Sequence, residues 1–265
     1  MLKITILMDN KVIDHRPFKL KAEWGFSALI ETKDGVILFD AGQTAATFAN
    51  FLALDLPWPQ QIVLSHGHFD HTGGLEPFLN LKTTKTLLCH PDSFLPRTYQ
   101  GAYIGLPFSK ELIQSYVQII EHCDPVEVLP NVWATGQIER KHPSCLVQGA
   151  TIFKDGQLLP DNIADDQALA IKTSKGGVVI LGCCHSGLKN TLIKAEKILK
   201  QKINFILGGT HLIAMQPEEI KKMFAEIELK MIAPCHCTGL EREFLLKNIL
   251  QNKCQLIGSG SVITI

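Results

Sequence analysis

The chain has 265 residues, of which 46% are hydrophobic and 20% charged, so it is long and apolar enough for a large globular domain with a packed core. Lys and Arg together number 26, as do Asp and Glu, and no basic cluster stands out. This balance argues against nucleic acid as the main partner.

The N-terminal segment, MLKITILMDN, lacks the pattern of a signal peptide, and no apolar run approaches the roughly 20 residues of a membrane span. We therefore expect a cytoplasmic protein with no membrane partner. Its eight cysteines are then expected to be mostly reduced. The sequence makes no prediction about oligomeric state.

The first part of the chain is dominated by expected strands. Apolar runs predict strands at 3–9, 26–32, 35–42, 61–65 and 84–90, and a helix at 44–54 that ends before Pro57. Residues 91–145 contain six prolines and are less regular, apart from a helix expected from Ser109 to about His122. We interpret 91–145 as a cap or insertion over the site, within a single domain spanning 1–265.

Strands and helices alternate more openly in the second part. Strands are expected at 168–173, 177–182, 204–211, 230–236 and 254–265. Helices are expected at 187–201, 217–227 and 240–250, the first of them amphipathic with lysines on its outer side. Strands interleaved with helices in both halves predict an α/β (α+β) protein whose sheets are covered by helices.

The strongest chemical signal is the segment SHGHFDHTGG at 65–74. It places His66, His68, Asp70 and His71 within six residues, directly after an apolar strand. Imidazole and carboxylate are ligands that Zn²⁺, Mn²⁺ and Fe accept, and a metal with an open coordination position is catalytic. We therefore predict a metal centre around these four residues.

HGHFDH resembles the HxHxDH signature of the metallo-β-lactamase superfamily. The resemblance implies a four-layer αββα sandwich with one or two divalent ions at one edge of its two sheets. Zinc is the first expectation, with Mn, Fe and Mg as alternatives. By position, His66 and His68 would bind the first metal, and Asp70 and His71 the second. The redox-active di-iron branch typically carries Glu where this chain has His68, which argues against that branch.

Two further segments resemble superfamily motifs. Asp40 in ILFDAG matches the first motif and is expected to orient the ligand loop, with a plain turn-forming role as the alternative. Most members carry GD where this chain has GCCH, so the residue after Gly182 is Cys183 and the bridging Asp is missing. His185 is expected to replace that Asp or to act as the third ligand of the first metal. Cys183 is expected behind the ligands, and a ligand role for Cys183 or Cys184 is the lesser alternative.

The last motif is PCHCTG, in which His236 is expected to bind the second metal. Cys235 and Cys237 have the opposite strand parity to His236, so we expect both thiols in packing. His211 in GGTH also follows a strand, and it is expected either to contact substrate or metal or to be structural.

A set of segments narrows the resemblance to one branch of the superfamily, the proteins named for 7,8-dihydropterin-6-methyl-4-(β-D-ribofuranosyl)aminobenzene-5′-phosphate synthase. These segments are HGHFDHTGGL, GLPFSKELI, TGQIER, DDQALAIKT, GCCHSGL, GGTHL and PCHCTG. We predict a metal-dependent hydrolase or transferase that acts on a small anionic or heterocyclic substrate, with Asp70 and His211 as catalytic groups. The alternative is a catalytically inactive metal-binding protein that senses a ligand.

The remaining basic residues carry weaker expectations. Arg140, next to Lys141, either meets a substrate phosphate or belongs to a solvated charge pair, with the second favoured. Ordinary packing or surface positions are expected for His15, His90, His122 and His142.

Overall fold

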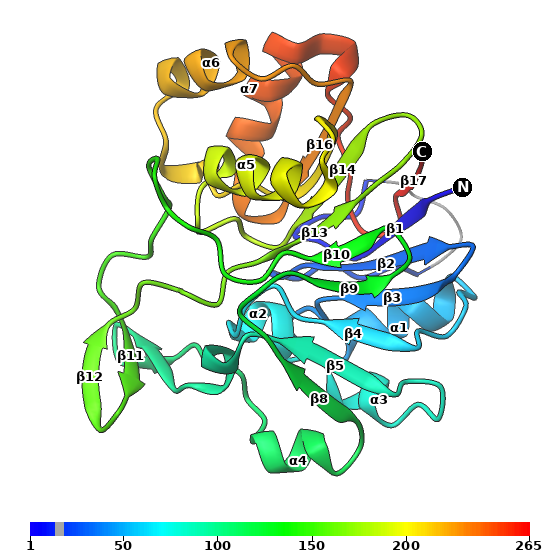
Figure 1. Cartoon of the computed structure of the whole chain (residues 1–265), viewed down its shortest axis with the longest axis vertical. Coiled ribbons are helices and arrows are strands. Elements are labelled where there is room, and N and C mark those ends of the chain that lie inside the picture. Colours follow the sequence, from blue (N-terminus) through cyan, green and yellow to red (C-terminus); the bar gives the residue numbers. More distant parts are fainter. Residues whose placement is uncertain (14–18) are drawn as a thin grey trace.

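Two β-sheets packed face to face form the centre of the computed structural model, which describes residues 1–13 and 19–265 (Figure 1). The first sheet has the order β17-β1-β2-β3-β4-β5-β8 and the second β16-β15-β14-β13-β10-β9. The first contains β1 (Lys3–Met8), β2 (Ser27–Thr32), β3 (Gly35–Phe39), β4 (Gln61–Val63), β5 (Thr86–Cys89), β8 (Gln118–Glu121) and β17 (Val262–Thr264). The second contains β9 (Val126–Leu129), β10 (Val132–Ala134), β13 (Ala168–Ile171), β14 (Gly177–Leu181), β15 (Ile203–Gly209) and β16 (Met231–Cys235).

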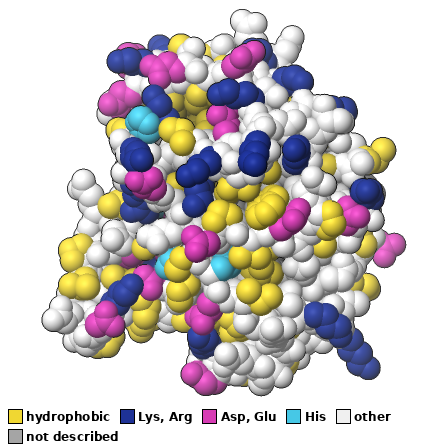
Figure 2. Space-filling model, viewed as in Figure 1, with side chains coloured by type: hydrophobic (Ala, Val, Ile, Leu, Met, Phe, Trp, Pro, Cys, Tyr) yellow, Lys and Arg dark blue, Asp and Glu magenta, His cyan; other side chains and the backbone are white. Residues whose placement is uncertain are grey.

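Helices cover the outer face of each sheet. The first sheet is covered by α1 (Ala46–Ala53) and α3 (Glu76–Leu79), with α4 (Lys110–Gln114) beside β8. The second is covered by α5 (Leu188–Leu199), α6 (Pro217–Ala225) and α7 (Leu240–Leu250). The predicted amphipathic character of α5 is confirmed, because Ala195 and Leu199 are buried while Lys189 and Lys197 are exposed. Figure 2 shows Lys and Arg side chains gathered over the region where Figure 1 places this helix.

Three separate hydrophobic clusters fill the spaces between the layers, which confirms the four-layer αββα arrangement. The alternation of β14 shows how the sequence builds them. Val178 and Ile180 face the first sheet, whereas Val179 and Leu181 face the helices. Successive side chains of a strand point to opposite faces, so a strand that is apolar at every position is buried on both sides.

Residues 91–145 divide between the main sheets and a separate small sheet. β8 joins the first sheet, and β9 and β10 join the second. The small sheet has the order β12-β11-β6-β7 and lies beside the sandwich, where β11 and β12 are seen at the lower left of Figure 1. It contains β6 (Arg97–Tyr99), β7 (Ala102–Tyr103), β11 (Ala150–Lys154) and β12 (Gln157–Pro160). The cap over the site and the single-domain boundary stay predictions.

The helix expected from Ser109 to His122 is only partly correct. Ser109 does cap α4, since its Oγ accepts a hydrogen bond from the Leu112 amide at 3.2 Å. The helix then ends at Gln114, and residues 118–121 form β8, parallel to β5. Ile119 packs against the outer core and Ile120 against the inner one, which is the alternation of a strand rather than a helix.

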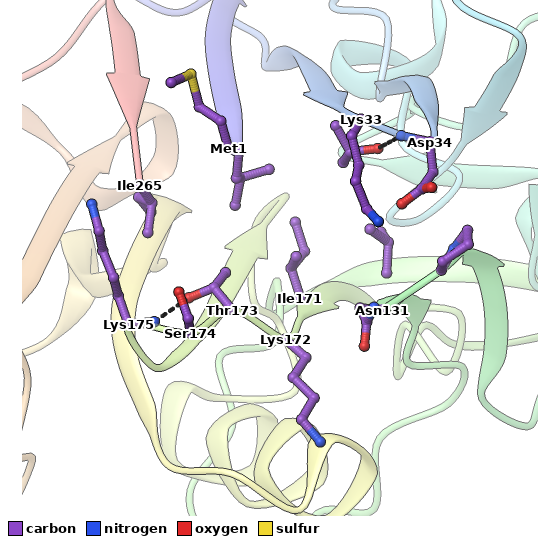
Figure 3. Close-up of a pocket in the computed structure, with 14 residues that line it drawn as sticks. Met1, Lys33, Asp34, Asn131, Ile171, Lys172, Thr173, Ser174, Lys175 and Ile265 are labelled. Atoms are coloured by element: carbon purple, nitrogen blue, oxygen red, sulfur yellow. Dashed lines mark hydrogen bonds between the residues drawn. The ribbon is translucent and has the colours of Figure 1, made fainter.

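A pocket lies at the end of the sandwich where β3 begins. Figure 3 shows its lining, which includes Lys33 and Asp34 from the turn between β2 and β3, Lys175 from the turn between β13 and β14, and Ile265 at the C-terminus. The predicted site residues follow the opposite ends of the strands, so this pocket is remote from them. None of the described helices has both the length and the hydrophobicity that crossing a membrane requires.

Candidate metal centre

The predicted site residues converge because they all follow the carboxyl ends of strands at one edge of the sandwich. β3, β4 and β5 run parallel in the first sheet, and β14, β15 and β16 run parallel in the second. Parallel strands place the loops after them at the same edge. Asp40 follows β3, the segment 66–71 follows β4, Cys183 and His185 follow β14, His211 follows β15 and His236 follows β16.

His66, His68 and His185 form the first ligand group. The nearest ring nitrogens of the three lie within 4.8 Å of one another, and His66 Nε2 is 3.0 Å from His68 Nδ1. All three side chains are buried. His185, for which two roles were left open, therefore sits with the two histidines assigned to the first metal.

Asp70, His71 and His236 form the second ligand group. His71 Nε2 and His236 Nε2 are 3.2 Å apart, and Asp70 Oδ2 lies 3.7 Å from the first and 3.5 Å from the second. Asp70 and His71 belong to the short helix α2 (Phe69–Thr72), which begins inside the motif. The structure thus brings together all six residues predicted as ligands.

Cys183 lies between the two groups rather than behind them. Its Sγ is 3.2 Å from His71 Nε2 and 3.3 Å from His236 Nε2, and it also falls within 4.8 Å of a His66 nitrogen. Gly182, just before it, has no room for a side chain, because a Cβ there would lie 2.1 Å from Ser65 Oγ. Cys184 points the other way, with its Sγ 3.4 Å from Thr191 Oγ1.

In the second group, hydrogen bonds to Nδ1 of each histidine ring leave Nε2, which faces the other ligands, as the electron-pair donor. His71 Nδ1 is 2.7 Å from the Asp40 carboxylate, and His236 Nδ1 is 3.1 Å from Asn10 Oδ1. Both partners are acceptors, so each ring carries its proton on Nδ1 and, when neutral, leaves a lone pair on Nε2. The Asp40 carboxylate therefore lies against the His71 ring, and its role in orienting the ligand loop stays a prediction.

Two rings of the first group, those of His185 and His66, are also held by hydrogen bonds to Nδ1. His185 Nδ1 donates to the Cys145 carbonyl at 2.8 Å, and its buried Nε2 has no hydrogen-bond partner. Ser65 Oγ donates to Asp40 at 2.6 Å, so it accepts from His66 Nδ1 at 2.9 Å. Lone pairs that converge in a buried space repel one another unless a cation lies between them, so this donor set fits a divalent metal.

The electrostatics also favour a cation. Burial opposes charge on His71, but the carboxylates of Asp70 and Asp40 outweigh it and raise the pKa of His71 to about 9. By contrast, burial lowers the pKa values of His66 and His185 well below the usual range, so both rings stay neutral and keep their lone pairs. Positive charge is thus stabilised near Asp70, and neutral ligands surround the first position.

His211 and Cys237 lie beside this arrangement. The His211 ring is 4.5 Å from that of His185, and its buried Nδ1 has no hydrogen-bond partner. Cys235 packs between the sheets as expected. The expectation for Cys237 is wrong, because its Sγ lies near Cys183 and His211. The reason is local: β16 ends at Cys235 and His236 has a left-handed φ of 52°, so strand parity does not extend to Cys237.

Sequence reasoning missed a buried ionic network that supports the ligand loop. Arg97 donates to Asp161 at 2.8 Å and to Asp165 at 2.7 Å. Asp165 also accepts the Gly67 amide at 2.7 Å, and Asp161 faces His68 Nε2 at 3.9 Å. The available signal was the acidic run DNIADD, which lies directly before an apolar strand.

The remaining polar residues have structural positions. Arg140 is half-buried and donates to the carbonyls of Asn162 and Ile163, and its contact with a phosphate stays a prediction. His90 accepts from the Asp92 amide, His122 contacts the Asp124 carbonyl, and His142 is half-buried. His15 lies outside the described residues.

Comparison with known proteins identifies the family. The sequence profile of the metallo-beta-lactamase superfamily matches residues 25–141. An uncharacterized protein of Methanocaldococcus jannaschii is 33% identical over 249 residues, which cover 90% of this chain and 91% of that protein. The chain belongs to the metallo-β-lactamase superfamily, and its fold is that of the metal-dependent hydrolases in it.

Two further relatives bear on activity. A second protein of M. jannaschii, named 7,8-dihydropterin-6-methyl-4-(beta-D-ribofuranosyl)-aminobenzene-5′-phosphate synthase, is 27% identical over 284 residues, which cover 99% of this chain and 96% of that protein. The crystal structure of Tm1679, described as a metal-dependent hydrolase of the beta-lactamase superfamily, has a TM-score of 0.87 at 25% identity and covers 100% of this chain and 99% of its own.

Proposed function

We propose that this protein is a metal-dependent enzyme that acts on a small anionic or heterocyclic substrate at the edge of the sandwich. The observation that carries the proposal is the set of buried imidazoles whose Nε2 atoms converge, because their Nδ1 atoms are held by Asp40, Asn10, Cys145 and Ser65. Such fixed rings are typical of metal ligands supported by a surrounding shell of hydrogen bonds.

The two ligand groups would each hold one divalent ion. His66, His68 and His185 would hold the first, and Asp70, His71 and His236 the second, with the Cys183 thiol between them. A divalent ion in such a site supplies Lewis acidity, which lowers the pKa of water and polarises a substrate oxygen. Thiol and imidazole ligands favour zinc over magnesium.

Two side chains are positioned to handle protons. The Asp70 side chain is 10% exposed, so its carboxylate reaches the open side of the second group and can orient a nucleophile or accept its proton. His211 is half-buried next to His185, and its Nδ1 has no hydrogen-bond partner. We assign to His211 the transfer of a proton to or from the substrate.

Hydrolysis is the reaction that we favour. It is supported by the full-length similarity to Tm1679, and by the converging lone pairs, which suit metal activation of water. The second candidate is a synthase or transferase reaction on a dihydropterin, supported by the full-length relative that carries a synthase name. A third possibility, a metal-binding sensor without turnover, is favoured only by the replacement of the superfamily's bridging Asp by Cys183.

The experiment combines metal analysis with turnover. The purified protein is analysed for Zn, Mn and Fe and then assayed on phosphodiesters, lactones and a dihydropterin, with His185→Ala as the test variant and His142→Ala as the control. We expect about two equivalents of metal, with about one lost in His185→Ala and none in His142→Ala. A protein that binds no metal after reconstitution would exclude the proposal, and full metal content without turnover would favour the sensor.

A further inference from the structure

A third cluster of potential ligands adjoins the two groups described above. It consists of Cys183, His211 and Cys237, and one ligand atom from each lies within 4.8 Å of the other two. Each residue stands two positions beyond the end of its strand, after β14, β15 and β16 respectively. These strands are parallel neighbours, so the fold itself places the loops after them, and with these loops the three side chains, at one edge of the sheet.

The backbone around this cluster is arranged to make room for the thiol of Cys237. A Cβ added at Gly209 would lie 2.6 Å from Cys237 Sγ and 2.3 Å from the Gly182 carbonyl oxygen, so no other residue fits there without a shift. His211 has a left-handed φ of 52°, a conformation that is uncommon outside glycine. Its Nδ1 is buried and has no hydrogen-bond partner.

We propose that Cys183, Cys237 and His211 bind a thiophilic divalent cation, such as Zn²⁺ or Cd²⁺, at a third position beside the metal centre. Two sulfurs and one imidazole nitrogen form a soft ligand set that selects such ions over Mg²⁺ or Mn²⁺. The position differs in chemistry from the first group, which is all imidazole, and from the second, which combines imidazole and carboxylate.

An ion at this position is linked to the metal centre through Cys183, whose Sγ also lies 3.2 Å from His71 Nε2 and 3.3 Å from His236 Nε2. The same ion also coordinates the imidazole of His211. Where His211 transfers protons, as the proposed function requires, the bound ion blocks that step, so an excess of Zn²⁺ inhibits turnover. This consequence rests on the proposed function, whereas ion binding at the cluster does not.

The test uses Co²⁺ as the probe, because cobalt–thiolate bonds absorb in the near ultraviolet. The full-length protein is stripped of metal and titrated with Co²⁺, and Cys237→Ala is compared with Cys235→Ala. The two residues flank His236, but Cys235 packs between the sheets and serves as the matched control. We expect Cys237→Ala to bind about one equivalent less than the unmodified protein and to lose about half of the thiolate band, while Cys235→Ala keeps both.

A second pair of variants repeats the comparison on the other strand. Cys183→Ala is expected to abolish the thiolate band, and Cys184→Ala to preserve it, since the Cys184 thiol contacts Thr191 instead. If a variant does not fold, X-ray absorption of the unmodified protein loaded with zinc counts metal–sulfur bonds directly. Scattering from two sulfurs on one ion supports the third position.

The outcomes separate this proposal from the proposed function. An unchanged metal count and band in Cys237→Ala, with metal still bound by the two main groups, overturns the third position and leaves the enzyme proposal intact. A protein that takes up no Co²⁺ at all overturns both. Inhibition by excess Zn²⁺ that persists undiminished in Cys237→Ala excludes the cluster as the inhibitory site.

Discussion

The Arg97 guanidinium donates through Nε to the Asp161 carboxylate at 2.8 Å, and both side chains are completely buried. The same guanidinium holds Asp165, which in turn accepts the amide of Gly67 between the first two ligand histidines. Arg97 begins β6 and Asp161 follows β12, so the base of the small sheet is joined to the metal-ligand loop.

Replacing Arg97 by Met is therefore expected to destabilise the protein strongly. Met keeps much of the volume but leaves the carboxylates of Asp161 and Asp165 buried and unpaired. Removing one partner of a buried ion pair costs about 3–5 kcal/mol, which denaturant unfolding measures directly. The control is Lys154→Met in β11 of the same small sheet, which breaks the pair of Lys154 with Asp92. The Lys154 side chain is 42% exposed, so about 0–1 kcal/mol is expected. Equal losses in the two variants would contradict this account.

Asp40→Asn is expected to weaken metal binding without unfolding the protein. Asp40 accepts hydrogen bonds from the Ser65 amide and hydroxyl and from His71 Nδ1, at 2.7, 2.6 and 2.7 Å. An amide side chain cannot accept all three, so the His71 ring loses its fixed orientation. Asp40 has a φ of 57°, which Asn also tolerates, so the backbone is spared.

The expected loss is roughly 10–100-fold in metal affinity, measured by competition with a chromophoric chelator. Asp34→Asn, in the exposed turn between β2 and β3, is the matched control and should leave the affinity unchanged. An Asp40→Asn protein with unaltered affinity would show that Asp40 only forms the turn before Gly42.

The glycine inside the HGH motif provides a third prediction. A Cβ at Gly67 would lie 2.2 Å from the Ser93 carbonyl oxygen and 2.5 Å from Arg97 Nη1. Gly67→Ala must therefore push the ligand loop away from the ionic network. We expect a loss of about 1–3 kcal/mol in the free energy of unfolding, together with weaker metal binding. A variant with the stability and metal affinity of the parent protein would mean that the loop does not rest on Arg97.

Most of the fold could be predicted because its strands are buried on both faces and its helices are amphipathic. β14 is apolar at every position after Gly177, and α5 alternates buried leucines with exposed lysines, so both are visible in the sequence alone. β8 was not predicted, because its four residues come shortly after a helix with a clear N-cap and resemble a continuation of that helix. Only pairing with β5, which is distant in sequence, makes that segment a strand.

Only part of the site could be predicted from the sequence. Residues that lie close together in the chain, such as His66 and Asp70, can be recognised as potential metal ligands by their spacing. Arg97 and Asp161 are 64 positions apart, and only their contact in the folded chain shows that they form an ion pair. Cys237 was misplaced because a single left-handed residue, His236, ended the alternation on which the expectation rested.

The last prediction concerns removal of the metal. His71 Nε2 and His236 Nε2 face each other at 3.2 Å, and His185 Nε2 is buried without a partner. The ligands are brought together only in the folded state, so bound metal stabilises the fold by mass action, by about 2.7 kcal/mol at 100 times its Kd. Stripping the protein with a chelator should lower its Tm, and adding Zn²⁺ should restore it.

His236→Ala removes one ligand of the second group and is expected to lose part of this metal-dependent shift in Tm. His142→Ala, at a half-buried position outside both ligand groups, should retain all of it. Calorimetric scans with and without chelator make the comparison. If the stripped and the zinc-loaded parent proteins melted at the same temperature, the converging lone pairs would not hold a metal in the folded state, because any ion bound preferentially there must raise the Tm.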